Sequence, residues 1–269
     1  MLFISTSGAL GRYVELPVPV TIGARALLAF VLLALYCRFK KMSFKVEKKD
    51  LPMVVLSGVL MGFHWITYFY ALQLSSVAIG MLSMFTYPVW TAFFEPFLLK
   101  TTFQKIHLLL AVLVLCGIYF LIPDLNMENS YTLAIGLGVV SAIVYALRNL
   151  LMKPKVVKYN GSLMMTYQTG IVGFLLLPAV VFADFSEVLS QWEALVTLAL
   201  LTTAIGHTLF LLSLKHFTVT TASILSSVQP VYGILIGMLF LSEFPSWSTV
   251  FGGILILTAV VVESVRTYR

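Results

Sequence analysis

Two histidines and a tryptophan stand at related positions in a sequence that is otherwise poor in chemically reactive side chains. His207 lies 142 residues after Trp65 (207 − 65 = 142), and His64 directly precedes that tryptophan. Histidine titrates near neutral pH, so two imidazoles that face one cavity could carry protons or hold a carboxylate. The alternative is that each histidine is neutral and bonded to a neighbouring carbonyl. We expect no metal site, because two imidazoles without clustered carboxylates do not complete one.

Arg25 and Glu95 are ionisable residues within apolar segments. A charge at the centre of a bilayer costs about 2.5–3.5 kcal/mol even on insertion scales. Arg25 is therefore either a cavity charge that contacts an anion, or an arginine that snorkels to the surface and pairs with a carbonyl or with Glu15. Glu95 is either a carboxylate that carries protons or an ion-pair partner of Lys100.

Aromatic and amide side chains are the remaining candidates for a substrate cavity that also contains the two histidines and Trp65. They are Tyr68, Tyr87, Trp90, Tyr145, Asn149, Gln168, Gln229 and Tyr232. Tyr and Trp also gather at membrane interfaces, so lipid-facing belts are the alternative. Tyr87 and Gln229 directly precede Pro88 and Pro230. They are the stronger candidates, and the buried amide of Gln229 needs a partner from a substrate or from a facing helix.

Motifs for nucleotide binding or hydrolysis are missing from the sequence. The chain contains no GxxxxGK[ST] for phosphates, no HExxH and no GxSxG nucleophile. We therefore expect no enzyme activity and no cofactor, and coupling to an ion gradient or facilitated exchange in place of nucleotide hydrolysis. The net charge of +6 does not indicate nucleic-acid binding, because Lys and Arg occupy short loops and form no basic face.

The elements that must position these residues are membrane-spanning helices. Of the 269 residues, 60% are hydrophobic and 10% are charged, whereas soluble domains are roughly 25% charged. A spanning helix needs about 20 apolar residues, and nine segments approach this length. They are Val18 to Tyr36, Leu51 to Leu72, Val77 to Leu99, Ile106 to Ile122, Tyr131 to Met152, Leu163 to Phe182, Trp192 to Leu214, Val219 to Leu241 and Trp247 to Val262. With Met1 to Leu10 as a truncated first helix, we predict an all-α polytopic bundle of ten transmembrane helices.

Loop charges alternate along the chain and predict the orientation of the helices. Cytoplasmic loops collect Lys and Arg, and the basic loops here contain Arg38, Lys40, Lys41, Lys45, Lys48, Lys49, Lys100, Lys105, Lys153, Lys155, Lys158 and Lys215. The opposite loops contain one basic residue, Arg12, and the acidic residues Asp124, Glu128, Asp184, Glu187, Glu193 and Glu243. Arg266 and Arg269 follow the last helix. The pattern predicts a multi-pass plasma-membrane protein with both termini in the cytoplasm.

An internal repeat relates the two halves of the chain. The stretch ALQLSSVAIGMLSMFTYPVWTAFFEPFLL aligns with SLKHFTVTTASILSSVQPVYGILIGMLFL, so that Pro88 matches Pro230 (230 − 88 = 142). An odd number of crossings separates the aligned helices, so the repeats, residues 1–124 and 130–266, are predicted to be inverted. Each proline removes a helical hydrogen bond, which predicts a hinge near the middle of the membrane. Small residues expected at close helix contacts are Gly58, Gly62, Gly136, Gly138, Gly233 and Gly237.

The sequence resembles the EamA-like transporters of the drug/metabolite transporter superfamily over nearly its whole length. The resemblance rests on TIGARALLAFVLLAL around Arg25, on LSSVAIGMLSMFTYPVW and FTVTTASILSSVQPVYG, and on LSEFPSWSTVFGGILILTAVVV. It implies ten helices in two inverted five-helix halves, a central substrate cavity and alternating access. Two departures are the short first helix and the stretch LLKTTFQKIH, which lacks the acidic residue that the family usually carries after the fourth helix. We expect Glu95 to replace that residue, whereas Glu243 keeps its place in the second repeat.

A secondary transporter is the function that these features predict, with two halves that rock around a site at mid-membrane. The resemblance allows amino acids, other organic metabolites and cationic drugs as substrates, and we expect proton-coupled export. A passive channel is the alternative, although no repeated polar ring is visible, and an intramembrane enzyme is the third hypothesis. The expected partners are the lipid bilayer, a small-molecule substrate and a proton, and a homodimer is compatible with the sequence.

Overall fold

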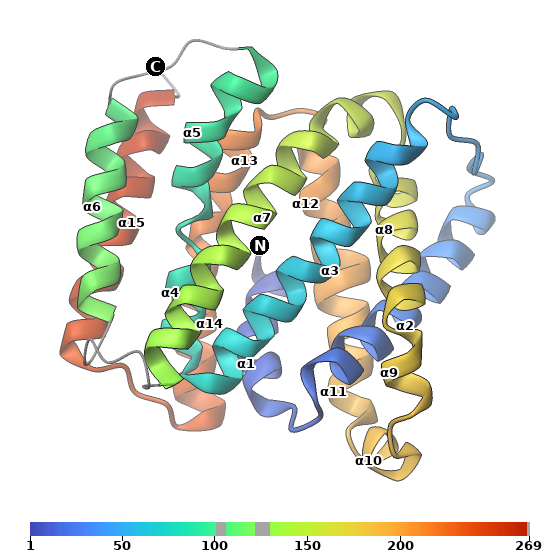
Figure 1. Ribbon diagram of the computed structural model, residues 1–269, viewed down its shortest axis with the longest axis horizontal. Coiled ribbons are helices and arrows are strands. Elements are labelled where there is room, and N and C mark those ends of the chain that lie inside the picture. The colour runs from blue at the N-terminus through green and yellow to red at the C-terminus, as the bar shows by residue number, and fades with distance from the viewer. Residues whose placement is uncertain (101–105, 122–129, 268–269) are drawn as a thin grey trace.

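The computed structural model describes residues 1–100, 106–121 and 130–267, and every regular element in these ranges is a helix. The elements are α1 (Leu2–Tyr13), α2 (Val18–Phe39), α3 (Leu51–Leu74), α4 (Val77–Met84), α5 (Tyr87–Leu99), α6 (Ile106–Leu121), α7 (Ser130–Lys158), α8 (Gly161–Leu175), α9 (Leu177–Val181), α10 (Phe185–Ser190), α11 (Trp192–Thr197), the π-helix η1 (Leu198–His207), α12 (Thr208–Ser213), α13 (Val219–Leu225), the 3₁₀ turn η2 (Ser226–Val228), α14 (Gln229–Leu241) and α15 (Trp247–Thr267). Figure 1 shows them side by side in one bundle, with the N-terminus near its middle.

Six helical segments are long and apolar enough to cross a membrane. They are Val18–Phe39, Leu51–Leu74, Val77–Leu99, Ser130–Lys158, Trp192–Ser213 and Val219–Leu241, and two shorter apolar helices are Val112–Leu121 and Trp247–Val262. The prediction of an all-helical membrane protein is therefore confirmed at this level. The number of ten crossings stays a prediction, and α1, with 12 residues, is shorter than a membrane span.

Four of the predicted segments are interrupted where the sequence suggested continuous helices. The segment Val77–Leu99 divides into α4 and α5, and the segment Val219–Leu241 divides into α13, η2 and α14. The predicted segment Leu163 to Phe182 breaks before Pro178, which lies in the first turn of α9. The predicted segment Trp192 to Leu214 passes through the π-helix η1. A proline fits the first turn of a helix because the N–H that it lacks has no helical partner there.

Pro88 and Pro230 stand directly after two of these interruptions. Pro88 lies in the first turn of α5 and Pro230 lies in the first turn of α14, and both side chains are buried. The α-helix before Pro88 ends at Met84 and restarts at Tyr87. Each segment can therefore change direction at these points without breaking a regular hydrogen-bond ladder.

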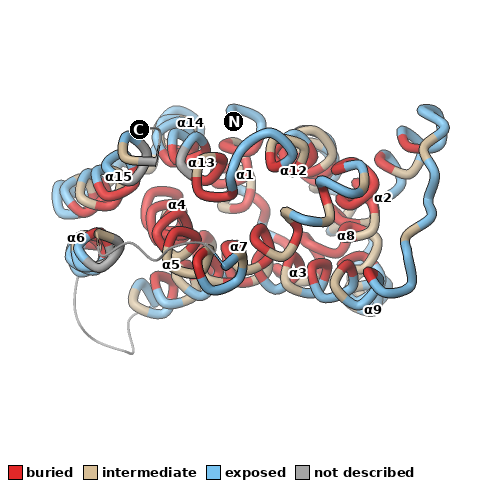
Figure 2. Tube along the Cα trace, turned by 90° about the horizontal axis from the view of Figure 1, so that it is seen from above, coloured by how far each residue is buried: buried red, intermediate tan, exposed pale blue. Residues whose placement is uncertain are grey.

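The core of the protein lies between two rows of helices. In Figure 2 one row contains α15, α14, α13, α1 and α12, the other contains α6, α5, α7 and α3, and the buried residues face inward. The largest contacts pair α3 with α7, α2 with α8, α6 with α15 and α1 with α14. Outward faces carry exposed apolar side chains such as Phe39, Phe182 and Leu239, as a helix surface in contact with lipid requires.

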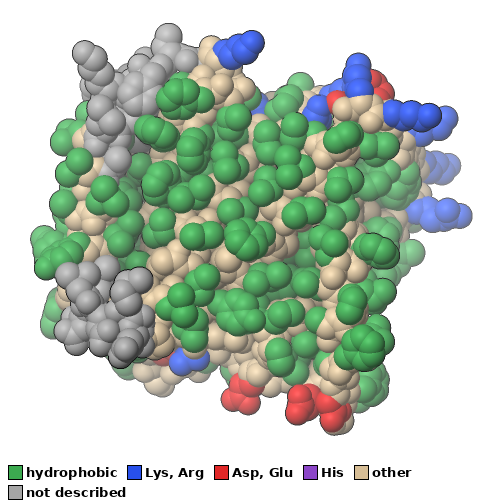
Figure 3. Space-filling model, viewed as in Figure 1, with side chains coloured by type: hydrophobic (Ala, Val, Ile, Leu, Met, Phe, Trp, Pro, Cys, Tyr) green, Lys and Arg blue, Asp and Glu red, His purple; other side chains and the backbone are tan. Residues whose placement is uncertain are grey.

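Charged side chains gather at the two ends of the bundle. On the face shown in Figure 3, Lys and Arg lie mostly along the upper and right edges, and Asp and Glu lie mostly along the lower edge. This separation is compatible with the predicted orientation, which stays a prediction. Several predicted loop charges and the end of one predicted segment lie outside the described residues: Lys105, Ile122, Asp124, Glu128 and Arg269.

A cluster of charges joins the two halves of the chain at the basic end. Asp50, which precedes α3, accepts hydrogen bonds from Lys155 Nζ at 2.5 Å, from Lys158 Nζ at 2.7 Å and from Tyr159 Oη at 2.7 Å. We call Asp50, Lys155, Lys158 and Tyr159 the basic-end cluster. These three contacts, Lys155 foremost, hold the pKa of Asp50 well below its usual value of 3.8. Asp50 is therefore ionised throughout the physiological pH range, and a change of pH within this range does not remove its charge.

A second cluster joins the two halves at the opposite end. Glu243, in the connection between α14 and α15, accepts a hydrogen bond from Arg12 Nε at 2.9 Å through one carboxylate oxygen. Its other oxygen accepts the backbone N–H of Val77 at 2.8 Å and thereby caps the first turn of α4. A carboxylate is favourable at a helix N-terminus because the unpaired N–H groups there carry partial positive charge. We call Arg12, Glu243 and the N–H of Val77 the acidic-end cluster.

Glycines bring several helices of the core into close contact. A Cβ atom at Gly58 or Gly62 would meet α8, and one at Gly233 or Gly237 would meet Met81 or Val77 of α4. A Cβ atom at Gly138 of α7 would come within 2.7 Å of the Cβ of Ser83. A Cβ atom at Gly136 would meet no described atom of another helix within 4 Å, so the expectation that Gly136 mediates a close helix contact is wrong.

Substitution of Gly138 by Ala is expected to lower the thermal stability of the purified protein. The new methyl group must displace Ser83, and overpacking of this kind costs about 1–3 kcal/mol. Gly136→Ala is the matched control on the same helix, and it is expected to be neutral or to stabilise α7 by up to about 1 kcal/mol through helix propensity. Equal melting temperatures of the two variants in detergent would show that the α4–α7 contact tolerates a larger residue.

Candidate functional site

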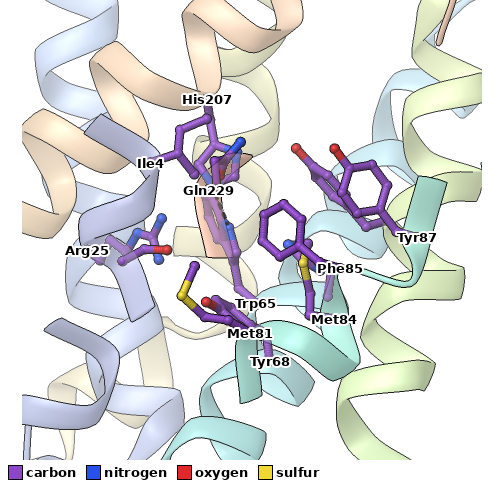
Figure 4. A pocket seen from close by; sticks show the side chains of 13 residues that line it. Ile4, Arg25, Trp65, Tyr68, Met81, Met84, Phe85, Tyr87, His207 and Gln229 are labelled. Carbon is purple, nitrogen blue, oxygen red and sulfur yellow. Dashed lines mark hydrogen bonds between the residues drawn. The ribbon is translucent and has the colours of Figure 1, made fainter. Parts of the chain in front are cut away.

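A small cavity lies at the centre of the bundle, where the interrupted segments meet α1, α2, α3 and α7. Figure 4 shows the side chains that line it: Ile4, Ser7, Arg25, His64, Trp65, Tyr68, Met81, Met84, Phe85, Tyr87, Tyr145, His207 and Gln229. Eight of these were candidates from the sequence: Arg25, His64, Trp65, Tyr68, Tyr87, Tyr145, His207 and Gln229. Their common location is a structural fact, and their contact with a substrate stays a prediction.

Arg25 is the only charged residue among the described side chains of this lining. Its side chain is fully buried, its Nε donates a hydrogen bond to Thr203 Oγ1 at 2.6 Å, and its guanidinium carbon lies 4.4 Å from the ring centroid of Trp65. A guanidinium over an indole ring gains cation–π attraction. Nη1 and Nη2 have no hydrogen-bond partner among the described residues. Arg25 is thus a buried cation and does not snorkel to the surface.

The π-helix η1 supplies the partners of Arg25 and Trp65. Thr203 Oγ1 donates to the carbonyl of Leu198, five residues earlier, and His207 ends the element. Trp65 Nε1 donates to His207 Nε2 at 3.4 Å. His207 Nε2 is therefore the unprotonated nitrogen, and Nδ1 carries the proton of the neutral ring. The π-helix is rare in proteins and frequently lies at functional sites.

His64 is held by α7. Ser141 Oγ lies 2.7 Å from His64 Nδ1 and donates its own proton to the carbonyl oxygen of His64 at 3.0 Å. Since the serine proton is used in that bond, His64 Nδ1 is the donor and Ser141 Oγ is the acceptor. The imidazole also stacks on Tyr145, with ring centroids 4.3 Å apart. His64 is therefore fixed in one orientation against the cavity.

Tyr87 and Gln229 lie next to the matched prolines, on the cavity side. Tyr87 Oη donates to the carbonyl of Ser223 at 3.3 Å and shares a short hydrogen bond with Ser226 Oγ. This contact ties the start of α5 to the interruption before α14. Gln229 is buried, and its amide Nε2 contacts the sulfur of Met1 at 3.4 Å. A thioether is a weak acceptor, so this amide is poorly paired within the protein.

A second buried arginine escaped the sequence reasoning, although it precedes a predicted cavity residue. Arg148 Nη1 donates to Asn149 Oδ1 at 2.8 Å, and Arg148 Nη2 donates to Gln168 Oε1. Gln168 Nε2 in turn donates to Ser57 Oγ at 3.0 Å. Asn149 and Gln168 are therefore partners of Arg148 and are not among the lining residues. The signal that could have located this group was a basic residue inside a predicted span, directly before a candidate amide.

Three further candidates lie away from the cavity lining. Trp90 stacks on Phe94 and its indole N–H has no partner among the described residues. The side chain of Glu95 is half-buried and accepts a hydrogen bond from Thr220. Tyr232 is 40% exposed. The structure thus separates these residues from the group around Arg25.

The cavity is small in this conformation. Its volume is about 20 Å³, which is room for about one water molecule, whereas sites for small organic ligands measure about 300–1,000 Å³. The lining combines aromatic rings, two thioethers and several N–H donors. Such a lining suits recognition of an organic molecule, provided that the surrounding helices move apart.

Comparison with known proteins places the chain among transporters. The EamA-like transporter family matches residues 1–122 and 132–265. The pseudopaline exporter CntI of Pseudomonas aeruginosa strain UCBPP-PA14 is 20% identical over 234 residues, which cover 86% of this chain and 81% of that protein. An uncharacterised transporter of Archaeoglobus fulgidus is 28% identical over 197 residues, covering 73% of this chain and 70% of the relative.

A protein crystal structure solved previously has the same fold. It superposes with a TM-score of 0.73 at 17% sequence identity and covers 100% of this chain and 96% of its own. The family match extends over nearly all of the sequence, and the apolar helices provide the multi-pass membrane architecture that such a match requires. The chain therefore belongs to the EamA-like transporter family, within the drug/metabolite transporter superfamily.

Proposed function

We propose that this protein is a secondary transporter that exports small organic metabolites by alternating access around the central cavity. The observation that carries the proposal is a buried, donor-rich cavity that lies between two clusters of charges at opposite ends of the bundle. Each cluster joins a residue before position 124 to a residue after position 130. Opening one cluster while the other stays closed would expose the cavity to one side of the membrane at a time.

A regular spacing of helices supports two related halves as the moving parts. Equivalent helices begin at Val18 and Gly161, at Leu51 and Trp192, and at Val77 and Val219. Their spacings are nearly constant, since 161 − 18 = 143, 192 − 51 = 141 and 219 − 77 = 142. The contacts between helices also correspond when the two halves are exchanged. The contact of α3 with α7 corresponds to that of η1 with α1, and the contact of α3 with α8 corresponds to that of η1 with α2.

The direction of the helices supports an inverted relation between these halves. Asp50, just before α3, and Leu214, just after α12, both contact lysines near the end of α7, namely Lys155 and Lys153. The start of α3 and the end of α12 therefore lie at the same end of the bundle. It follows that α3 and the segment Trp192–Ser213 run in opposite directions. These two segments are the proposed equivalents in the two halves.

The matched prolines are the proposed hinges of this motion. Both stand where an α-helix is interrupted, and Tyr87 connects one interruption to Ser223 and Ser226 beside the other. A bend at these points would widen the cavity without unwinding either segment. We further propose that export is driven by a proton gradient, with His64, His207 or the half-buried Glu95 as the proton carrier.

Comparison of metabolites in cells with and without the protein tests the proposed function. A transporter of this kind is expected to change the ratio of external to internal concentration for one class of compound. The identified compound is then tested for counterflow in proteoliposomes. This assay distinguishes a carrier from a channel, because only a carrier transiently accumulates labelled substrate in vesicles preloaded with an excess of unlabelled substrate. An unchanged metabolite profile, together with no counterflow, contradicts the proposal.

Gln229→Ala is expected to reduce counterflow about fivefold, which corresponds to one lost hydrogen bond of about 1 kcal/mol. Among the described residues the buried amide of Gln229 bonds only to the sulfur of Met1, and we propose that it binds the substrate. Leu239→Ala, on the exposed face of the same helix, is the control and is expected to transport normally. Normal transport by well-inserted Gln229→Ala protein removes Gln229 from the binding site.

Asp50→Asn and Arg12→Gln are expected to open opposite ends of the bundle. With Met84→Cys as a reporter in a cysteine-free chain, Asp50→Asn is expected to increase maleimide labelling several-fold from the basic end only. Arg12→Gln is expected to do so from the acidic end only. Lys49→Gln, which removes the exposed Lys49–Glu47 pair, is the control and should change neither rate.

The closure of the basic end is expected to be insensitive to pH over the physiological range. Because the pKa of Asp50 is lowered, the contribution of the cluster is fully present above the ordinary value of 3.8 and is lost only as the pH falls through the lowered value. The reactivity of a thiol with maleimide itself depends on pH. The labelling rate of the protein is therefore divided by that of free cysteine at the same pH. A rise in corrected labelling between about pH 8 and pH 5 would show that another group controls this end.

A further inference from the structure

The interior of the bundle holds positive charge without a described counter-ion. Arg25, Arg148 and Asp50 are the charged residues that are buried within the described ranges. Asp50 lies at the basic end and is already bonded to two lysines. In the part of the chain that the structure describes, no carboxylate forms an ion pair with Arg25 or Arg148. A buried charge is unfavourable unless it is paired, so this arrangement calls for an explanation.

The two arginines differ in how their charge is satisfied. Both terminal nitrogens of Arg148 donate to neutral amide oxygens, those of Asn149 and Gln168. Both terminal nitrogens of Arg25 lack a partner among the described residues, although its Nε is bonded to Thr203. Arg148 is thus stabilised by the protein itself, and Arg25 presents an unused pair of donors. Figure 4 shows the guanidinium of Arg25 among the side chains that line the cavity.

His207 adds a third unused donor to the lining. Trp65 donates its indole N–H to His207 Nε2, so the proton of the neutral imidazole is on Nδ1, and Nδ1 has no partner within the described residues. Among the described side chains that line the cavity, the buried nitrogens without a partner are Arg25 Nη1, Arg25 Nη2 and His207 Nδ1, and all three are N–H donors. The complementary ligand group is therefore an acceptor with negative charge.

We propose that the cavity selects an organic anion, whose carboxylate is held by Arg25 and His207, and that it rejects organic cations. The proposal rests on the transport function proposed above and specifies its substrate class. A guanidinium presents two parallel N–H groups that match the two oxygens of a carboxylate. The body of the anion would lie against the rings of Trp65, Phe85 and Tyr87 and the thioethers of Met81 and Met84.

The same lining disfavours a substrate that carries an ammonium group. Among the described residues that line the cavity there is no Asp or Glu, so an ammonium group would have no ion-pair partner. An anion neutralises the charge of Arg25, whereas a cation adds repulsion in a region from which water is largely excluded. A zwitterion leaves its own ammonium group unpaired. Discrimination among these classes therefore arises from both attraction and repulsion.

Binding of three compounds of nearly equal shape tests the selection by charge. Radiolabelled phenylacetate is equilibrated by dialysis with the purified full-length protein, and 2-phenylacetamide and phenethylammonium are used as competitors. The anion is expected to bind about tenfold or more tightly than the neutral amide, as charge-assisted hydrogen bonds imply, and the ammonium compound is expected not to compete. Equal or tighter binding of the ammonium compound, or no saturable binding of phenylacetate at millimolar concentration, overturns the proposal.

Variants on α2 assign the selection to Arg25. Arg25→Gln is expected to weaken phenylacetate binding about tenfold or more while leaving the affinity for 2-phenylacetamide unchanged. Arg25→Lys is expected to retain part of the preference, because it keeps the charge and loses the paired donors. Arg38→Gln makes the same substitution at an exposed position of this helix and should bind all three compounds normally. If folded Arg25→Gln protein loses the same amount of affinity for phenylacetate and for 2-phenylacetamide, Arg25 has a structural role and does not select the anion.

Transport of the same compounds in proteoliposomes separates this proposal from the proposed function. Saturable, Arg25-dependent binding of phenylacetate without counterflow of any organic anion supports the anion site and contradicts transport. Counterflow of phenethylammonium in preference to phenylacetate supports transport and contradicts the anion site. If Arg25→Gln fails to fold, the order of affinities for the three compounds in the unmodified protein still decides the question.

Discussion

The charge of Arg25 is the constraint around which the centre of the bundle is built. A guanidinium buried among apolar helices needs hydrogen bonds and polarisable neighbours, since no described carboxylate neutralises it. Thr203 supplies one hydrogen bond, and the face of Trp65 supplies cation–π attraction. Thr203 belongs to the π-helix, and Trp65 is fixed by His207 at the end of the same element. An irregular helix, an indole and an imidazole are thus arranged around one positive charge.

Arg148 is a second buried arginine, and hydrogen bonds to other side chains of the protein stabilise its charge. Its terminal nitrogens are bonded to Asn149 and Gln168, and Gln168 is anchored by Ser57 on α3. This network joins α7, α8 and α3 and leaves little capacity for a ligand. Arg25 sits in the same interior with both of its terminal nitrogens unused. Arg148 Nε and Asn149 Nδ2 also lack a partner among the described residues. The contrast between the two arginines therefore lies in their terminal nitrogens, which the protein binds in Arg148 and leaves without a described partner in Arg25.

Hydropathy was sufficient to predict an all-helical membrane protein, and the internal repeat selected several residues that line the cavity. Helices follow from runs of apolar residues, and the repeat directed attention to Tyr87, Gln229, His64 and His207 as residues near interrupted or facing helices. The π-helix could not be predicted, because its change of register depends on tertiary contacts such as the bond from Arg25 to Thr203. Arg148 lies inside the predicted span Tyr131 to Met152 and was missed because a charge near the end of a span resembles a loop residue. Its burial and its bonds to Asn149 and Gln168 depend on how α7 packs against its neighbours.

The short helix α4 connects closure of the acidic end to the shape of the cavity. Glu243 caps its first turn at Val77, and its last turn places Met81 and Met84 in the cavity lining. The eight residues of α4 span only about 12 Å. A helix this short bends little, so a displacement of its first turn also displaces Met81 and Met84. Directly beyond α4 the chain is interrupted before Pro88, and a bend at this interruption would move α4 relative to α5. In the proposed alternating-access motion, release of the Arg12–Glu243 contact and enlargement of the cavity would therefore be parts of one motion. A ligand that fits only the enlarged cavity would then favour the state in which this end is open.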